Sequence, residues 1–228
     1  MTVSVELAEL LSTRRSTRHF DPEREIPEDV LGRVLAAPLT MPHAGNTYDW
    51  RAVVLRRSQR DPDRWPAVFE ALMRQSYVEE AAVLVAWAVQ PAWWAEQYRA
   101  NVEELLNRGL IEPERAGDLL SAVQAGPDLG PLTTGLVGEA MMGVAAAMLV
   151  AIDAGLGATV TACLPGALAK ALEIPKDAAV CQWGILALGW PAEGAGAGRT
   201  GTTAPKPAVS DQYFEGVWGE PLRRDSGG

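Results

Sequence analysis

The spacing of apolar residues along the chain predicts an alternation of helices and strands. Residues 81–89 form an unbroken apolar run, which is typical of a strand buried on both faces. Residues 181–189 and the shorter segment 51–55 are mostly apolar and predict two further strands. Apolar residues at helical spacing predict helices, some of which begin near a proline or an acid. These helices cover residues 5–14, 26–37, 63–77, 93–107, 112–124, 136–154 and 165–172. Since no repeat and no second domain is visible, residues 1–228 are expected to form a single domain.

The helix expected over residues 136–154 is mostly apolar and rich in alanine, methionine and glycine. Small residues permit close approach of helices, so we expect it to lie buried at the centre of a domain or of a dimer. Its longest apolar run, residues 140–152, is shorter than the roughly 20 residues that a membrane span needs. The N-terminus lacks a basic region followed by a long apolar core, which argues against a signal peptide. The sequence thus predicts a soluble, cytoplasmic protein with no membrane partner.

The composition of the chain is that of a globular protein, and it argues against nucleic-acid binding and against a metal site. Hydrophobic residues make up 48% of the 228 residues and charged residues 21%, which argues against disorder. The net charge of −9 disfavours binding to nucleic acid. The cysteines, Cys163 and Cys181, and the histidines, His19 and His43, lack the spacing of metal ligands, so no metal site is expected.

The residues after the last expected strand form an extended C-terminal tail, residues 192–228. Residues 192–208 are rich in glycine, alanine, threonine and proline and predict a flexible link. The piece that follows carries Tyr213, Phe214 and Trp218. Aromatic side chains on a segment without a core of its own need a surface to cover, and a partner subunit is one candidate.

Two short motifs carry the candidate chemistry. The first packs three arginines and two hydroxyls into five residues, Arg14-Arg15-Ser16-Thr17-Arg18. Arginine presents a planar fork of donors that suits phosphates and heteroaromatic edges. The second motif, Pro42-His43-Ala44-Gly45-Asn46-Thr47-Tyr48-Asp49-Trp50, combines a tight turn with an amide side chain that both donates and accepts hydrogen bonds.

With the alanine-rich helix that ends in Gly155-Leu156-Gly157, these motifs make almost the whole chain resemble the FMN-dependent nitroreductase family. The resemblance implies an α+β fold in which helices surround a central mixed sheet. It also implies an intertwined homodimer with FMN at the interface, held by both chains. Residues 91–131 correspond to the most variable part of the family, a helical excursion that commonly forms a lid over the cofactor.

The resemblance assigns cofactor contacts to both motifs. Arg14, Arg15, Ser16 and Arg18 correspond to the segment that holds the phosphate, the ribityl chain and the pyrimidine edge; a phosphate dianion is well matched by arginines. The alternative is that Arg14 or Arg15 pairs with a surface acid such as Glu9 or Glu25.

The second motif corresponds to the family's Pro-Ser-x-x-Asn loop, which usually reaches the flavin from the other subunit. Pro42 and Asn46 are kept, whereas His43 stands in place of the customary serine. Asn46 is expected to bond the flavin edge, or else to be a left-handed turn residue. His43 is either a titratable group beside the flavin or a loop histidine without a catalytic part, and no other catalytic residue is assigned.

Three further groups complete the expected site. By position, Val160, Thr161, Ala162 and Cys163 line the edge at flavin N5, where a backbone N–H stabilises charge on the reduced ring; Cys163 itself is expected to be a packing residue. Lys206 is the expected C-terminal phosphate ligand. Trp93, Trp94 and Tyr98 either stack over a planar substrate or pack at the dimer interface. Trp50, Trp87 and Trp183 are expected in the core.

The resemblance implies an oxidoreductase in which FMN carries the hydride chemistry. NAD(P)H is the expected donor, and a nitroaromatic, a quinone or a similar electron-poor small molecule is the expected acceptor in a ping-pong reaction. The chain has no G-x-G-x-x-G fingerprint, as expected if nicotinamide only visits the flavin. The alternatives are a biosynthetic FMN-dependent dehydrogenase or oxidase acting on a peptide-like or other natural product, and a flavin-binding protein without turnover.

Overall fold

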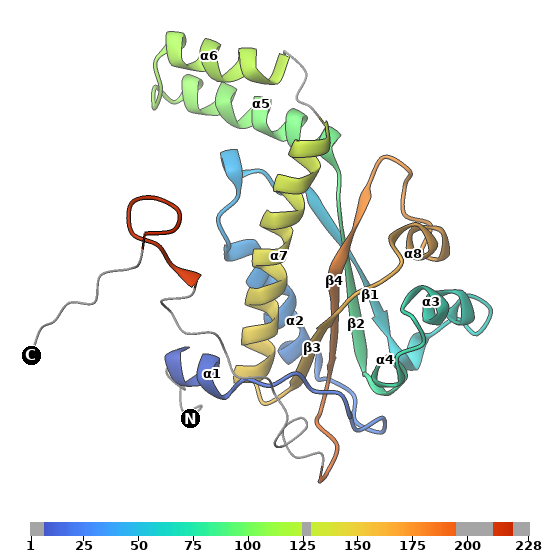
Figure 1. Ribbon diagram of the computed structural model, residues 1–228. Coiled ribbons are helices and arrows are strands. Elements are labelled where there is room, and N and C mark those ends of the chain that lie inside the picture. Colours follow the sequence, from blue (N-terminus) through green and yellow to red (C-terminus); the bar gives the residue numbers. More distant parts are fainter. Residues whose placement is uncertain (1–6, 125–128, 195–211, 221–228) are drawn as a thin grey trace, which may run out of the picture. The chain divides into compact units, whose positions relative to one another are not determined.

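Four strands form one antiparallel sheet in the order β1-β2-β4-β3 (Figure 1). The computed structural model describes residues 7–124, 129–194 and 212–220 of the chain. The strands are β1 (Trp50–Arg56), β2 (Val83–Val89), β3 (Gly157–Thr161) and β4 (Ala179–Gly189). The sheet expected from the resemblance was mixed, but every strand pairing within the described part of the chain is antiparallel. Continuous apolar runs did not reveal this, because helices cover both faces of this antiparallel sheet.

Two layers of helices cover the two faces of the sheet, and alternate side chains of β2 point toward one layer or the other. Val83, Val85 and Trp87 face a layer formed by α2 (Glu28–Ala36) and α7 (Leu129–Asp153). The intervening residues of β2 face α3 (Trp65–Ala71), α4 (Ser76–Glu80) and α8 (Pro165–Ala171) on the other side, as Figure 1 shows. All seven residues of β2 are buried, so this strand is the centre of the core. The remaining α-helices of the described residues are α1 (Leu7–Thr13), α5 (Pro91–Asn107) and α6 (Pro113–Gln124), and three short 3-10 helices are η1 (Ala37–Thr40), η2 (Ala44–Asn46) and η3 (Arg57–Gln59).

Helix α7 is longer than the sequence indicated. It has 25 residues and begins at Leu129, where a loop was expected. By length and composition its segment Gly130–Asp153 qualifies as a membrane span, a test that core helices of soluble proteins also pass. One third of the most apolar window is buried inside the protomer, through a face that includes Leu136, Ala140 and Val144. The expected burial therefore holds for one face of α7.

Two further elements differ from their predictions. The helix expected over residues 63–77 is divided into α3 and α4, because Met73 and Arg74 adopt left-handed φ values of 58° and 50°. In α1, which has apolar residues at helical spacing, Leu10 is buried whereas Leu7 and Leu11 are exposed.

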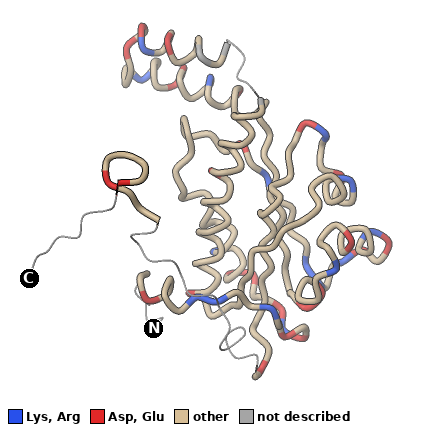
Figure 2. Tube along the Cα trace, in the orientation of Figure 1, with Lys and Arg blue, Asp and Glu red and all other residues tan. Residues whose placement is uncertain are grey.

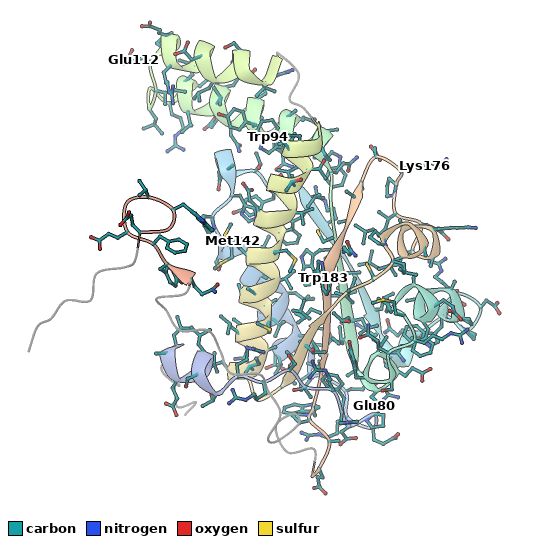
Figure 3. The ribbon with its side chains drawn as sticks, viewed as in Figure 1. Glu80, Trp94, Glu112, Met142, Lys176 and Trp183 are labelled. Atoms are coloured by element: carbon teal, nitrogen blue, oxygen red, sulfur yellow. The ribbon has the colours of Figure 1, made fainter. Side chains whose placement is uncertain are left out.

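A β-bulge interrupts the pairing of β2 with β4. Ala86 faces Ile185, whereas Ala88 faces Val180, so four residues of β4 lie opposite Trp87. A Cβ on Gly184 would lie 2.6 Å from the Cβ of Cys181, which explains the glycine in this bulge. Trp183 is 63% exposed as a result, and the expectation that it belongs to the core is wrong. Figure 3 labels this side chain on β4.

The chain separates into two compact units, residues 1–198 and 199–228. In the second unit the structure describes residues 212–220, where the rings of Phe214 and Trp218 pack with their centroids 4.8 Å apart. Trp218 is 91% exposed. Most of the predicted link over residues 192–208 lies outside the described residues.

Candidate functional site

The arginine-rich segment lies beside the edge of β3. The N–H of Thr17 donates to the carbonyl of Ala158 at 3.1 Å. An added Cβ on Gly157 would lie 2.7 Å from the side chain of Thr17, so this glycine permits the close approach. The structure thus brings together two groups of predicted site residues that are about 140 positions apart in the sequence.

The far end of the same segment is also fixed. Phe20 is buried, and its N–H donates to a carboxylate oxygen of Glu80 at 2.9 Å. The N–H of Asp21 donates to the carbonyl of Trp190 at 2.8 Å. Residues 14–21 are therefore held at several points along their length, and the arginines extend from a fixed backbone.

The three arginines are not equivalent. The Arg15 guanidinium donates to the carbonyls of Ser12 and Arg14, so it folds back on the end of α1. Within the described part of the chain neither Arg14 nor Arg18 makes an ion pair, and Glu25 lies 3.6 Å from Arg57 instead. Figure 2 shows the basic segment that follows α1. Arg14 and Arg18 are thus available to a bound anion.

The hydrogen bond from Thr17 also fixes which backbone groups of β3 face outward. In an antiparallel ladder, alternate residues direct both N–H and C=O away from the partner strand. Since Ala158 faces the arginine segment, the N–H groups of Val160 and Ala162 face the same edge. The N–H of Cys163 is used by the carbonyl of Gln182 at 2.9 Å. Of the four predicted residues, Val160 and Ala162 therefore present amides to a ligand at this edge.

Cys163 is a packing residue in this structure. Its side chain is 1% exposed and belongs to the core between the sheet and α8. Burial raises the pKa of its thiol to about 11, so the thiolate is disfavoured.

Sequence reasoning missed a polar cluster at the end of β3. The Gln75 side-chain amide donates to Oγ1 of Thr161 at 2.8 Å, and the Tyr77 hydroxyl lies 2.7 Å from the same oxygen. Tyr77 also contacts Oε1 of Gln75. Because each hydroxyl has one proton, the consistent arrangement is a closed ring in which Thr161 donates to Tyr77 and Tyr77 donates to Gln75. This ring fixes three polar side chains beside the predicted N5 edge.

The second motif forms a loop whose histidine is locked as a neutral ring. The indole N–H of Trp50 donates to Nε2 of His43 at 2.9 Å, so Nε2 carries no proton. Nδ1 of His43 lies 2.8 Å from the carbonyl of Met41 and must be the protonated nitrogen. Both ring nitrogens are thus occupied within the loop, which favours the interpretation of His43 as a loop histidine.

Asn46 adopts a left-handed conformation with a φ of 54°, directly after Gly45 with a φ of 66°. Its side chain is exposed, as is Pro42. The turn interpretation of Asn46 is therefore observed, and it leaves the side-chain amide available to a ligand. The described residues show no hydrogen bond between this loop and the arginine segment.

The aromatic residues of α5 have different surroundings. Trp93 lies under the guanidinium of Arg51 at 3.9 Å and lines a cavity of about 180 Å³ beside α8. Trp94 packs against the core cluster to which α7 contributes, and its ring centroid lies 5.0 Å from that of Tyr98; Figure 3 labels Trp94. All three side chains contact other residues of the same protomer, and no observed contact supports a role for them in substrate binding.

Asp49 is the most unusual residue of the loop. It is fully buried, and neither carboxylate oxygen has a hydrogen-bond partner among the described residues. Burial and the nearby charge of Glu139 raise its pKa to about 6. The Asp49 carboxyl therefore titrates near neutrality. Lys206, the expected C-terminal phosphate ligand, lies outside the described residues.

Comparison with known proteins identifies the family. The model of the nitroreductase family matches residues 11–190, which include the arginine segment, the loop and the whole sheet. The chain belongs to the nitroreductase family. This confirms the family and the α+β fold class predicted from the sequence.

Several proteins of known structure or activity resemble this chain. A CLA biosynthesis enone reductase of Lactiplantibacillus plantarum is 29% identical over 122 residues; the match covers 52% of this chain and 53% of the relative, so the chain spans about half the length of that curated relative. The crystal structure of CLA-ER, an enone reductase, superposes with a TM-score of 0.72 at 20% identity, covering 94% of this chain and all of that one. An Exiguobacterium sibiricum nitroreductase-type protein in complex with FMN gives a TM-score of 0.71 at 17% identity, covering 93% and 99%.

The residues of the arginine segment and of the β3 edge fit FMN. Arg14 and Arg18 offer charge to a phosphate, and the outward amides of Val160 and Ala162 offer donors to a heteroaromatic edge. The hydroxyl and amide groups of the Gln75–Tyr77–Thr161 ring lie at the same end of β3. This combination of a cationic segment and a row of donors is what a mononucleotide with a polar planar ring needs.

Proposed function

We propose that Arg14, Ser16 and Arg18 bind the phosphate and ribityl chain of FMN, and that the amides of Val160 and Ala162 lie at the ring's N5 edge. The observation that carries this proposal is the hydrogen bond from Thr17 to Ala158, because it holds the cationic segment against the open edge of β3. Bound FMN supplies hydride transfer, and the chain supplies binding and orientation. Asn46 is assigned to the flavin as well, through a second copy of the chain.

A homodimer is part of the proposal. Helix α7 is mostly apolar, yet only part of it is buried within the protomer, and Met142 is 40% exposed. A second copy that covers this surface also offers a way to bring a 42–46 loop to the arginine segment, which the described residues of one protomer do not do. Sedimentation velocity of the FMN-loaded protein is expected to give a dimer; a monomer at micromolar concentration contradicts this part.

The proposed reaction is the reduction of electron-poor acceptors, such as nitroaromatics and quinones, with NAD(P)H as the donor, in the cytoplasm. No side chain is assigned as acid or base, because both nitrogens of His43 are occupied. Anaerobic stopped-flow mixing with NADH and with NADPH tests the proposal: at least one is expected to bleach the bound flavin, and an acceptor then restores its colour. Flavin that neither nucleotide bleaches refutes the reductase and favours a dehydrogenase or oxidase that takes electrons from a natural product.

The similarity to an enone reductase supports a second candidate acceptor, a C=C bond conjugated to a carbonyl. In that reaction a hydride adds to the β-carbon, a proton adds to the α-carbon, and reduced flavin is oxidised. Pre-reduced protein is mixed with an enone or with a nitroaromatic, and the rates of flavin reoxidation are compared. Slow reoxidation by both, and by quinones, favours the alternative of a flavin-binding protein without turnover.

A further inference from the structure

Helix α5 holds the loop of residues 43–48 by its backbone. Oε1 of Gln97 accepts the N–H of Tyr48 at 2.8 Å, and Nε2 of Gln97 donates to the carbonyl of Tyr48 at 3.2 Å. One side-chain amide therefore satisfies both backbone groups of one loop residue. Such a paired contact fixes the distance and the orientation of the loop relative to α5.

One turn further along α5, the side-chain amide of Asn101 also bonds to the backbone of the loop. Its Nδ2 donates to the carbonyl of Gly45 at 2.7 Å and to that of Asn46 at 3.0 Å. These two loop residues are the consecutive left-handed ones, a conformation that costs free energy in a non-glycine residue and persists when its surroundings hold it. Asn101 therefore binds the loop at the position where its backbone needs support.

Between Gln97 and Asn101 on α5, Tyr98 makes a further contact with the loop, through its ring. A Cβ on Gly45 would lie 2.3 Å from this ring, so the loop backbone packs directly against it. On the opposite side, the N–H of Ala44 donates to Oε1 of Glu139 on α7 at 3.2 Å. The loop is thus held between α5 and α7.

We propose that Gln97 and Asn101 are positioning residues for Asn46. They fix the backbone orientation of Asn46. Helix α5, the first helix of the 91–131 excursion, therefore determines how the loop presents the Asn46 side-chain amide to the flavin. This inference rests on the proposed function, because contact between Asn46 and FMN is part of that proposal. A displacement of α5 would be transmitted to the loop through four hydrogen bonds.

The test compares Asn101→Ala, Asn101→Asp and Asn101→Gln with Arg99→Ala. Asp preserves the shape of Asn101 without its N–H donors, Gln retains the donors, and Arg99 is an exposed residue of the same helix without a partner among the described residues. Hydrogen exchange of the peptide that contains residues 43–50 and FMN dissociation constants are measured on the full-length protein. The Ala and Asp variants are expected to exchange these amides about tenfold faster and to bind FMN about tenfold more weakly, as for the loss of one or two net hydrogen bonds.

Asn101→Gln is expected to recover most of both properties, and Arg99→Ala to match the wild type. Unchanged exchange in the Ala and Asp variants overturns the inference, as does faster exchange with unchanged FMN affinity. If the wild type itself binds no FMN, the proposed function fails. The positioning of Asn46 toward a flavin fails with it, and the exchange data then show separately whether α5 sets the loop.

Discussion

Replacement of Asp49 by asparagine tests whether a buried carboxylate limits the stability of this protein. Asp49 lies immediately before β1, is fully buried and has no hydrogen-bond partner for either oxygen among the described residues. Burial and the charge of Glu139 disfavour its ionised form, while the residue's own backbone amide and the charge of Arg51 favour it more weakly. Asparagine has nearly the same shape and carries no charge, so Asp49→Asn removes the cost of burying this charge with little change in packing.

The size and sign of the effect follow from the pKa. A rise from 3.8 to about 6 corresponds to about 3 kcal/mol of disfavoured ionisation. Between these two pH values the folded protein holds a proton on Asp49 that the unfolded chain has lost, so the free energy of unfolding falls as pH rises from about 4 to 6 and the Asp49 contribution is then constant. Above pH 7 we expect Asp49→Asn to be about 1–3 kcal/mol more stable than the wild type, because an unpaired amide also carries a cost.

Equilibrium urea unfolding of both proteins between pH 4.5 and 8, at fixed protein and FMN concentrations, measures this difference. Other carboxyl groups titrate in the same range, so the informative quantity is the difference between the variant and the wild type at each pH. Asp63→Asn removes an exposed carboxyl, which water solvates in the folded and the unfolded chain alike, and it is the matched control: its difference from the wild type is not expected to grow as pH rises. A difference for Asp49→Asn that stays constant or shrinks as pH rises refutes the reasoning.

Three further changes test the site. Gly45→Ala places a Cβ 2.3 Å from an aromatic ring of α5 at a positive φ, and it is expected to destabilise the protein by about 1–3 kcal/mol in urea unfolding; an unchanged midpoint contradicts this contact. Tyr77→Phe opens the hydroxyl–amide ring and should weaken FMN binding about three- to tenfold in a fluorescence titration, whereas unchanged affinity separates the ring from the flavin. Arg14→Ala combined with Arg18→Ala is expected to yield colourless protein after purification, and normal flavin content in this variant would remove the proposed phosphate site.

Local sequence patterns predicted most of the helices and strands, because the residues of each of these elements favour it by their own spacing and type. The run over residues 81–89 is apolar on both faces, and it forms β2 with every residue buried. The division of the predicted helix 63–77 has no such signal. Left-handed backbone at Met73 and Arg74 is not marked by glycine or asparagine, so the break between α3 and α4 is imposed by tertiary packing. The sequence likewise underestimated α7, because glycine, proline and threonine near its start are typical of a loop.

The sequence likewise indicated only part of the candidate site. The resemblance indicated the arginine segment and residues 160–163, and the structure places the two side by side through Thr17 and Ala158. It gave no indication of the Gln75–Tyr77–Thr161 ring, whose hydrogen bonds join residues more than 80 positions apart, nor of the exposed Trp183. For Trp183 a signal was present and was not used: a glycine inside an otherwise apolar strand indicates a bulge, and Gly184 follows directly. Since such a bulge lets consecutive residues leave the regular alternation, an aromatic residue beside a strand glycine is better treated as a surface candidate than as core.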